Sequence, residues 1–409
     1  MAKVLAGDPP DWPGDSTALN PFIRYRQLLY SYDVVSGSGR NSDVASAFGR
    51  TVGDLDDAIF AVCGQRFRIT PFARRGALSD ALGFSRAGGV WVKDETGNVS
   101  GSHKGRHLAG IMLCFLHIRP DERPDLAIAS CGNAALAAAV IARAAQWPLK
   151  TFVPPDANPE VVNRLKQLGA AAVTCPRRPG EVGDPCYHRF REALASGAVP
   201  FCCQGPDNGL TIEGGETLAY EIVDQLAGTR LDAVVVQVGG GALASACVQG
   251  FERAVALGRL PAIPRIFTVQ TQGAAPLARA FERVAARVAQ HGIADALAYA
   301  ATHRSEFMWP WEREPRSIAR SILDDETYDW LAVVKGMLET GGRALVVDED
   351  ALEAANRQAR DTTGVDVDHT GSAGLAGLVA LRASGEVSSG DNVAVIFSGV
   401  RRSPSPARR

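Results

Sequence analysis

The sequence predicts an α/β protein of two domains, each built on a mostly parallel, twisted sheet flanked by helices. From about residue 126 onward, short apolar runs alternate with helix-like stretches. This alternation is typical of strand–helix–strand units with parallel strands. The chain also has 409 residues, more than one ordinary hydrophobic core accommodates, so two domains are expected.

The predicted elements follow from apolar periodicity and turn residues. Strands are expected at residues 90–95, 126–129, 149–153, 171–175, 233–238, 266–270, 344–347 and 393–397. Helices are expected at residues 21–32, 44–63, 75–82, 107–116, 134–145, 159–168, 186–196, 213–226, 242–255, 275–287, 350–363 and 372–381. Gly49 and Gly53 are expected to interrupt the second helix, residues 1–20 to be irregular, and Arg401 to Arg409 to form a disordered tail.

The composition limits the classes of function. Hydrophobic residues make up 46% and charged residues 22% of the chain, which is typical of a globular enzyme. The net charge is −2 without a basic stripe, so nucleic-acid binding is not expected. No apolar run has the ~20 residues that span a membrane, and the N-terminus lacks a secretory signal. We therefore expect a cytoplasmic protein whose eight cysteines are reduced thiols and form no zinc site.

A lysine stands between a loop and a helix in Gly101-Ser102-His103-Lys104-Gly105-Arg106. Such a lysine can act as an amine nucleophile if its surroundings lower its pKa. Taken alone, it is more often a solvated surface group.

Two turns are candidate ligand sites. Gly239-Gly240-Gly241 follows the strongest strand signal and precedes a helix, which is the geometry that holds a phosphate, although a tight turn without ligand is the alternative. Ser130-Cys131-Gly132-Asn133 lies between a strand and a helix, where backbone amides can hold a carboxylate and Asn133 can bond a ring oxygen. Here the alternative is that Asn133 only caps the helix. Ser398 ends the last strand and is weak evidence alone.

Taken together, these parts are those needed to hold pyridoxal phosphate, with Lys104 forming the Schiff base. Their order resembles that of the fold-type II pyridoxal-phosphate enzymes, the tryptophan synthase beta-subunit superfamily. The matching stretches are Thr70-Pro71-Phe72, Lys93-Asp94-Glu95, Gly101 to Arg106, Ser130 to Asn133 and Glu213 to Ala219. The similarity runs from about Thr70 to Gly399.

The resemblance implies a role for each motif. Lys104 would carry the cofactor and move the proton at the substrate α-carbon, and Asn133 would contact the 3-oxygen of the ring. His103 would either stack on or flank the ring, or fill the site where the family usually has Phe. Ser398 would bond the pyridine nitrogen, which suits β-elimination because a neutral partner leaves that nitrogen largely unprotonated. The phosphate would lie on Gly239, Gly240, Gly241, Ala242 and Leu243, and the substrate carboxylate on Ser130, Cys131, Gly132 and Asn133.

The resemblance also implies a division of the chain. A larger cofactor-binding domain would combine residues 1–106 with 205–409, and a smaller substrate-closing domain would span 107–204. The cofactor would lie in the cleft between them, and the protein would be a homodimer. No metal is expected, because Gln270 stands near where a dehydratase-like metal site would want an acid.

The expected reaction is α,β-elimination from a small L-amino acid through an aminoacrylate, as in ammonia-lyases and dehydratases. Serine, threonine and diaminopropionate are the candidate substrates. One alternative is a threonine synthase-like replacement, for which Arg316 and Arg320 are candidate phosphate ligands, and another is a catalytically inactive paralogue. Cys131 would relay a proton if its pKa were lowered, or else simply fill space.

Overall fold

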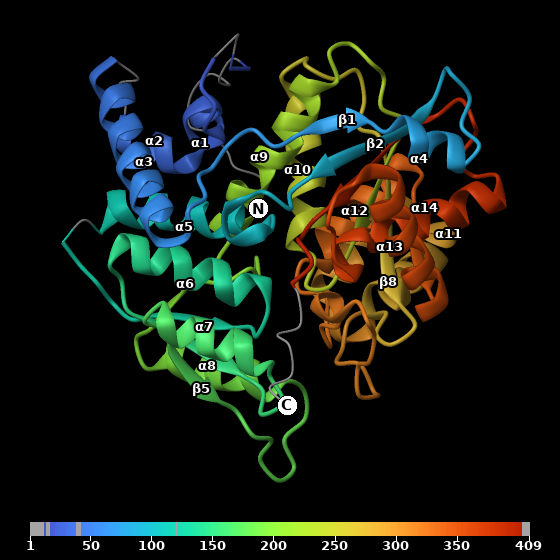
Figure 1. Cartoon of the computed structure of the whole chain (residues 1–409). Coiled ribbons are helices and arrows are strands. Elements are labelled where there is room, and N and C mark those ends of the chain that lie inside the picture. Colours follow the sequence, from blue (N-terminus) through green and yellow to red (C-terminus); the bar gives the residue numbers. More distant parts are fainter. Residues whose placement is uncertain (1–11, 14–16, 38–41, 120, 403–409) are drawn as a thin grey trace, which may run out of the picture.

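Two sheets organise the chain in the computed structural model, which describes residues 12, 13, 17–37, 42–119 and 121–402 (Figure 1). The larger sheet has the strand order β1-β2-β10-β7-β8-β9 and the smaller one β5-β4-β3-β6. Only β1 is antiparallel to its neighbour β2, and all other neighbours are parallel. The strands are β1 (Phe72–Arg74), β2 (Gly89–Asp94), β3 (Leu126–Ala129), β4 (Leu149–Val153), β5 (Ala171–Thr174), β6 (Val199–Pro200), β7 (Ala233–Gln237), β8 (Arg265–Thr271), β9 (Ala344–Val347) and β10 (Asn392–Phe397).

Helices cover both sheets. They are α1 (Pro21–Arg24), α2 (Tyr30–Ser36), α3 (Ser42–Cys63), α4 (Gly76–Ala81), α5 (Lys104–Ile118), α6 (Asn133–Ala145), α7 (Pro159–Gln167), α8 (Pro185–Ala195), α9 (Leu210–Gln225), α10 (Ala242–Ala256), α11 (Pro276–Thr302), α12 (Trp330–Thr340), α13 (Glu349–Thr363) and α14 (His369–Ser384). Short 3-10 helices lie at Arg26–Leu28, Val99–Gly101, Arg304–Glu306 and Arg320–Ile322. This confirms the predicted α/β class with parallel sheets.

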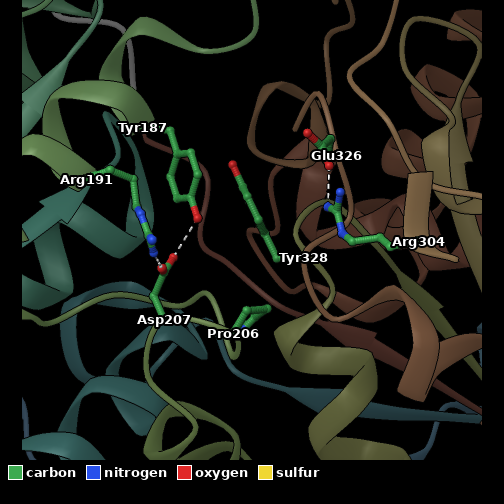
Figure 2. A pocket seen from close by; sticks show the side chains of 7 residues that line it. All are labelled: Tyr187, Arg191, Pro206, Asp207, Arg304, Glu326 and Tyr328. Atoms are coloured by element: carbon green, nitrogen blue, oxygen red, sulfur yellow. Dashed lines mark hydrogen bonds and ion pairs between the residues drawn. The ribbon is translucent and has the colours of Figure 1, made fainter. Parts of the chain in front are cut away.

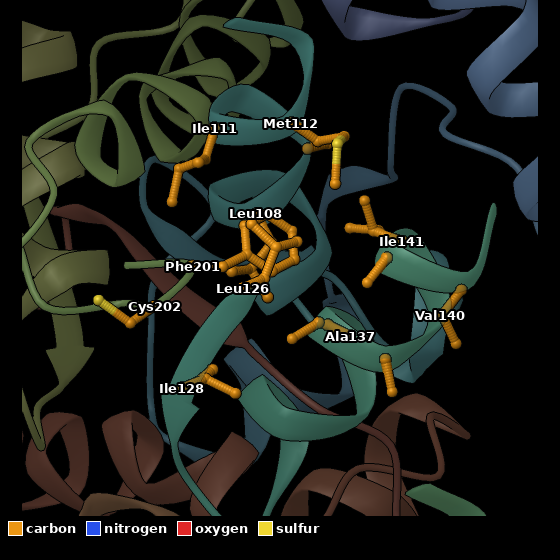
Figure 3. Packing of buried hydrophobic residues seen from close by; sticks show 14 of the residues in the cluster. Leu108, Ile111, Met112, Leu126, Ile128, Ala137, Val140, Ile141, Phe201 and Cys202 are labelled. Atoms are coloured by element: carbon orange, nitrogen blue, oxygen red, sulfur yellow. The ribbon is translucent and has the colours of Figure 1, made fainter. Parts of the chain in front are cut away.

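Helix α5 is buried from Gly105 to Phe115 and packs against other elements on two sides. On one side Leu108 and its neighbours pack against Leu126 of β3 and Phe201 in a core shared with the smaller sheet (Figure 3). On the other side Gly110 meets Gly214 of α9, where an added Cβ would lie only 2.7 Å from the Gly214 Cα. The first residue of this central helix is Lys104, so packing on both sides fixes the position of the lysine.

The N-terminal helices differ from the expected division of the chain. Phe22 of α1, Tyr32 of α2 and Phe48 of α3 belong to the same core as β3 and β4. Parts of residues 21–36 and 42–63 therefore share a core with the smaller sheet, whereas Tyr25 and Leu28 pack against Tyr220 of α9. The expectation placed everything before residue 107 in the larger domain. An amphipathic helix pattern shows that one face is buried, but not which partner buries it.

Several predicted boundaries were wrong. Helix α3 passes unbroken through Gly49 and Gly53, and an isolated glycine costs a helix only about 1 kcal/mol. The expected helix from residue 21 to 32 is instead α1, a 3-10 turn and the start of α2. Strands β1 and β6 and helix α12 had no prediction. The expected irregular N-terminus and tail fall mostly outside the described residues. Within the described ranges, no helix is both long and apolar enough to cross a bilayer.

Candidate active site

Lys104 begins α5 directly after a tight turn at Ser100 and Gly101, which both have positive φ. The turn is held against the chain that leaves β10, because Ser102 forms a β-bridge with Gly399. Lys104 is half-buried. Its positive charge opposes the rise in the pKa values of Asp324 and Asp329 that burial causes. The lysine therefore lies near the acids of the segment before α12.

A buried charge cluster fixes the helix that carries Lys104. Arg106 is fully buried and its Nε donates to Glu95 Oε2 at 2.8 Å, while its Nη1 donates to Glu221 Oε1 at 2.6 Å. Lys93 Nζ donates to Glu221 Oε2 at 2.5 Å. Two cations and two carboxylates thus balance, as buried charges require.

The pKa shifts in the cluster follow from this pairing. Burial alone would raise the pKa of Glu95, but Arg106 beside it brings that pKa down to about 2. Burial lowers the pKa of Lys93 against the opposing pull of Glu221. Thr70 completes the cluster, since its Oγ1 donates to Glu95 Oε1 at 2.5 Å. The stretches around Thr70, Lys93 and Arg106 therefore have a positioning role in this chain.

The glycine turn lies under the segment from Ile322 to Asp329. Gly241 has φ +97°, a conformation that favours glycine. Added Cβ atoms at Gly239 and Gly240 would meet the Asp324 carboxylate and, at 3.0 Å, the Tyr328 ring. Thr327 Oγ1 donates to the Gly239 carbonyl at 2.9 Å. The Gly240 amide acts on the Asp324 carboxyl group and opposes the rise of its pKa, so an acidic side chain lies beside the turn.

Two acids with shifted pKa values line this part of the site. Burial raises the pKa of Asp324 to about 6, against the opposing charge of Lys104 and with repulsion from Asp184 adding to it. Burial also raises the pKa of Asp329 to about 7, against the Gly205 amide and Lys104. Carboxyl groups perturbed in this way beside a lysine are characteristic of functional sites.

Ser398 follows β10 and has a fixed partner at the end of β7. The Nε2 of Gln237 donates to Ser398 Oγ at 2.6 Å and to the carbonyls of Gly371 and Ile396 at 3.0 Å each. Carbonyls only accept, so the orientation of this amide is settled. The serine oxygen is therefore an acceptor for Gln237, and its hydrogen is available to another group.

The turn from Ser130 to Asn133 faces the same region. Gly132 caps α6 and Asn133 is its first residue, without a capping side-chain bond. Asn133 lies against Gly399, and an added Cβ at Gly132 would be 3.4 Å from Ser321 Oγ. The alternative in which Asn133 serves only as a capping residue is therefore not what the structure shows.

The side chains of His103 and Cys131, each with more than one role expected from the sequence, lie in different environments. Burial and the Lys104 charge hold the pKa of His103 well below its usual value, so the ring is neutral and its Nδ1 donates to the Ser398 carbonyl at 3.1 Å. Its Nε2 is buried and has no partner among the described residues. Cys131 is an exposed residue, but desolvation of its thiol and the nearby Asp156 and Asp184 raise its pKa. The condition for a proton relay, a lowered thiol pKa, is not met.

A hollow of about 380 Å³ is lined by Tyr328, whose ring also lies against Gly240, and by Tyr187 and Pro206 (Figure 2). Its two arginines are both paired with acids. Arg191 donates to Asp207 at 2.5 Å, and Arg304 forms an ion pair with Glu326. The hollow is therefore balanced in charge.

The comparison with known protein families decides the identity of the fold. A family model described as "Pyridoxal-phosphate dependent enzyme" matches residues 65–399. The chain belongs to this family. Its members depend on pyridoxal phosphate, and the predicted resemblance to fold-type II enzymes is confirmed.

Relatives within the family have several activities. Threonine synthase of Methanosarcina acetivorans is 24% identical over 81% of this chain and 74% of that protein. A serine dehydratase-like protein of Rattus norvegicus is 32% identical over 45% of this chain and 52% of that protein. Threonine deaminase isoform 2 of Solanum lycopersicum (TM-score 0.64, 19% identity, 90% and 92% of the two chains) and an aspartate racemase (TM-score 0.64, 20% identity, 86% and 96%) share the fold.

The described residues fit the family's cofactor. The glycine turn offers backbone amides at the start of α10, and Ser398 has a hydroxyl hydrogen to donate. The unpartnered Nε2 of His103 supplies a buried polar atom near Lys104. Asp324 and Asp329 are at odds with a phosphate, because their ionised carboxylates would lie beside it at the glycine turn.

The structure thus gathers the predicted residues around one cleft and adds others. Asp324, Asp329 and Gln237 were missed, although Gln237 is the single polar residue ending a run of valines. Arg316 and Arg320 are exposed, and Arg316 pairs with Glu314 at 2.5 Å, so neither is drawn into the site by a described contact.

Proposed function

We propose that this chain is a pyridoxal-phosphate-dependent lyase that removes the α-proton and the β-substituent of a small L-amino acid. The products would be ammonia and a 2-oxo acid. When bound, the cofactor supplies a Schiff-base linkage and an electron-withdrawing ring. The residues of the chain bind, orient and move protons around it.

Each motif has a part in the proposal. Lys104 is the first residue of the packed helix α5. It holds the cofactor and moves the proton at the substrate α-carbon. The amides from Gly239 to Leu243 hold the phosphate. The amides at the start of α6, from Ser130 to Asn133, orient the substrate carboxylate. Cys131 forms part of the wall of this turn and moves no proton, because its pKa is raised.

The hydrogen bond between Gln237 and Ser398 is the observation that carries elimination. Because the Gln237 amide supplies the hydrogen in that bond, the serine can donate its own to the pyridine nitrogen. A neutral hydroxyl donor leaves that nitrogen without a proton of its own. Held in this way, the cofactor would withdraw electrons less strongly, which would favour departure of the β-substituent over accumulation of charge at the α-carbon.

The charges near Lys104 favour an unphosphorylated substrate. Asp324 and Asp329 line the cleft, and the arginines of the nearby hollow are already paired. A substrate phosphate would meet these acids without an unpaired cation. Serine, threonine or diaminopropionate carries a neutral or cationic β-group and fits this balance.

A second candidate is a threonine synthase-like replacement on phosphohomoserine. It is favoured by the relatives that match 81% of the chain, among which are threonine synthases of Methanosarcina acetivorans and Mycobacterium tuberculosis. This reaction would require Arg191 or Arg304 to exchange its acidic partner for the substrate phosphate.

We also propose that the protein is a homodimer, which light scattering can test.

The test uses the purified protein with pyridoxal phosphate. The wild type is expected to develop a visible absorption band that Lys104→Ala lacks, and to release ammonia and a 2-oxo acid from one of the three candidate amino acids. Phosphate release from phosphohomoserine without such products would establish the second candidate. A coloured protein that converts none of these compounds would indicate an inactive paralogue.

A further inference from the structure

The segment that follows β10 is fixed on both sides before it reaches the cleft. The Val400 N–H donates to the Gly101 carbonyl at 2.9 Å, and Val400 also forms a β-bridge with Val367. The Arg401 N–H donates to the Asp366 carbonyl at 2.8 Å. This pairing delivers the next residue, Arg402, to the space between the turn before Lys104 and the start of α6.

Arg402 joins these two turns through its side chain. Its Nη2 donates to Asn133 Oδ1 at 2.9 Å and to the Ser100 carbonyl at 2.8 Å. Its Nε donates to the same Asn133 oxygen at 3.3 Å. Ser100 lies four residues before the lysine, and Asn133 begins the helix at the substrate turn. One guanidinium therefore ties the two halves of the site together.

These contacts settle the orientation of the Asn133 amide. A guanidinium can only donate, so the atom it contacts must be the amide oxygen. The nitrogen then points the other way, towards Gly399, where an added Cβ would lie 2.9 Å from Asn133 Nδ2. Gly399 adjoins Ser398, so the N–H group of Asn133 is directed to the side of the site proposed for the cofactor ring.

We propose that Arg402 is a positioning residue that holds the Asn133 amide with its N–H towards the 3-oxygen of the cofactor. This inference rests on the proposed function for the place of the ring. Without Arg402 the Asn133 amide could rotate and turn its oxygen towards the 3-oxygen of the cofactor, so that two hydrogen-bond acceptors would face each other. The arginine also brings a positive charge close to the 3-oxygen, which stabilises the anionic form of that oxygen.

The surroundings of Arg402 are consistent with a role beyond surface pairing. Burial lowers its pKa, against the attraction of Asp368. Burial also raises the pKa of Asp368 to about 6. Asp368 is the titratable group that acts on Arg402 among the described residues, and it stays unchanged in the variants below.

The neighbouring Arg401 provides a matched control. Both arginines are exposed residues, but the Arg401 Nε donates to Asp366 Oδ1 at 2.8 Å and not to Asn133. The variants are therefore Arg402→Gln, Arg402→Lys and Arg401→Gln, each checked for an unchanged thermal unfolding midpoint. The readouts are the dissociation constant of pyridoxal phosphate and the pH titration of the visible band, both measured without substrate.

Arg402→Gln is expected to weaken cofactor binding about tenfold, the loss of one charge-assisted contact. The midpoint of its band titration should move up by roughly half a pH unit, because a nearby positive charge disfavours the protonated form of the linkage. Arg402→Lys keeps the charge and should keep the wild-type midpoint while losing part of the affinity. Arg401→Gln should behave as wild type.

The proposal is overturned if Arg402→Gln matches wild type in both readouts, or if Arg401→Gln shifts them equally. Failure of the proposed function is a separate result: a wild type that binds the cofactor but converts no amino acid leaves both cofactor readouts in place.

Discussion

Replacing Asp324 by asparagine is expected to stabilise the cofactor-free protein at neutral pH. The carboxyl group has a pKa of about 6 in the folded chain, against a usual value of 3.8. Each pH unit corresponds to 1.36 kcal/mol, so ionised Asp324 costs the fold up to about 3 kcal/mol. Asparagine has the same size and still offers an oxygen to the Gly240 amide, but it carries no charge.

The sign follows from proton linkage. Because the folded pKa lies above the unfolded one, the folded state holds the proton more tightly. The cost is absent below about pH 4, grows between pH 4 and pH 6, and is complete above that window. The gain in unfolding free energy for Asp324→Asn should therefore be near zero at pH 4 and reach up to about 3 kcal/mol at pH 7.5.

The assay is urea unfolding at several pH values, with Asp361→Asn as a control on the exposed face of α13. A gain for Asp324→Asn that is constant with pH, or that falls towards neutral pH, would refute the reasoning. The same variant should bind pyridoxal phosphate more tightly at pH 7.5, because its phosphate would no longer meet a carboxylate at the Gly240 amide.

Three further substitutions have defined outcomes. Arg106→Met leaves two buried carboxylates with only one cation and should lower the urea-unfolding free energy by about 3–5 kcal/mol, whereas a loss below about 1 kcal/mol would contradict the pairing described. Gly241→Ala forces a side chain to φ +97° and brings a Cβ within 2.9 Å of Thr327, so cofactor affinity measured by absorbance should fall at least about tenfold. Gly258→Ala, also at positive φ but in open space, should leave that affinity unchanged. Cys131→Ser should keep turnover within about threefold with an unchanged pH profile, and a hundredfold loss would show that the thiol takes part.

The sequence was sufficient for the α/β class and for the motifs that converge on the cleft. Gly239 and Ser398 follow β7 and β10, neighbouring parallel strands of the larger sheet whose carboxyl ends share one edge, and Ser130 follows β3 of the smaller sheet. Asp324 and Arg402 could not be placed in this way. They come from segments without periodicity, and only the tertiary fold brings one to the glycine turn and the other to Asn133.

The charge cluster around Arg106 is distinct from Lys104, the lysine proposed to act in catalysis, and holds the helix that carries it. Two residues along a helix correspond to a rotation of about 200°, so Arg106 faces the interior while Lys104 faces the cleft. A descendant of this protein could exchange Lys104 for another residue and still fold around an intact Arg106. The presence of Lys93, Glu95 and Arg106 in a sequence therefore indicates the fold. Whether such a protein is an active enzyme depends on the residues on the side of the helix where Lys104 lies.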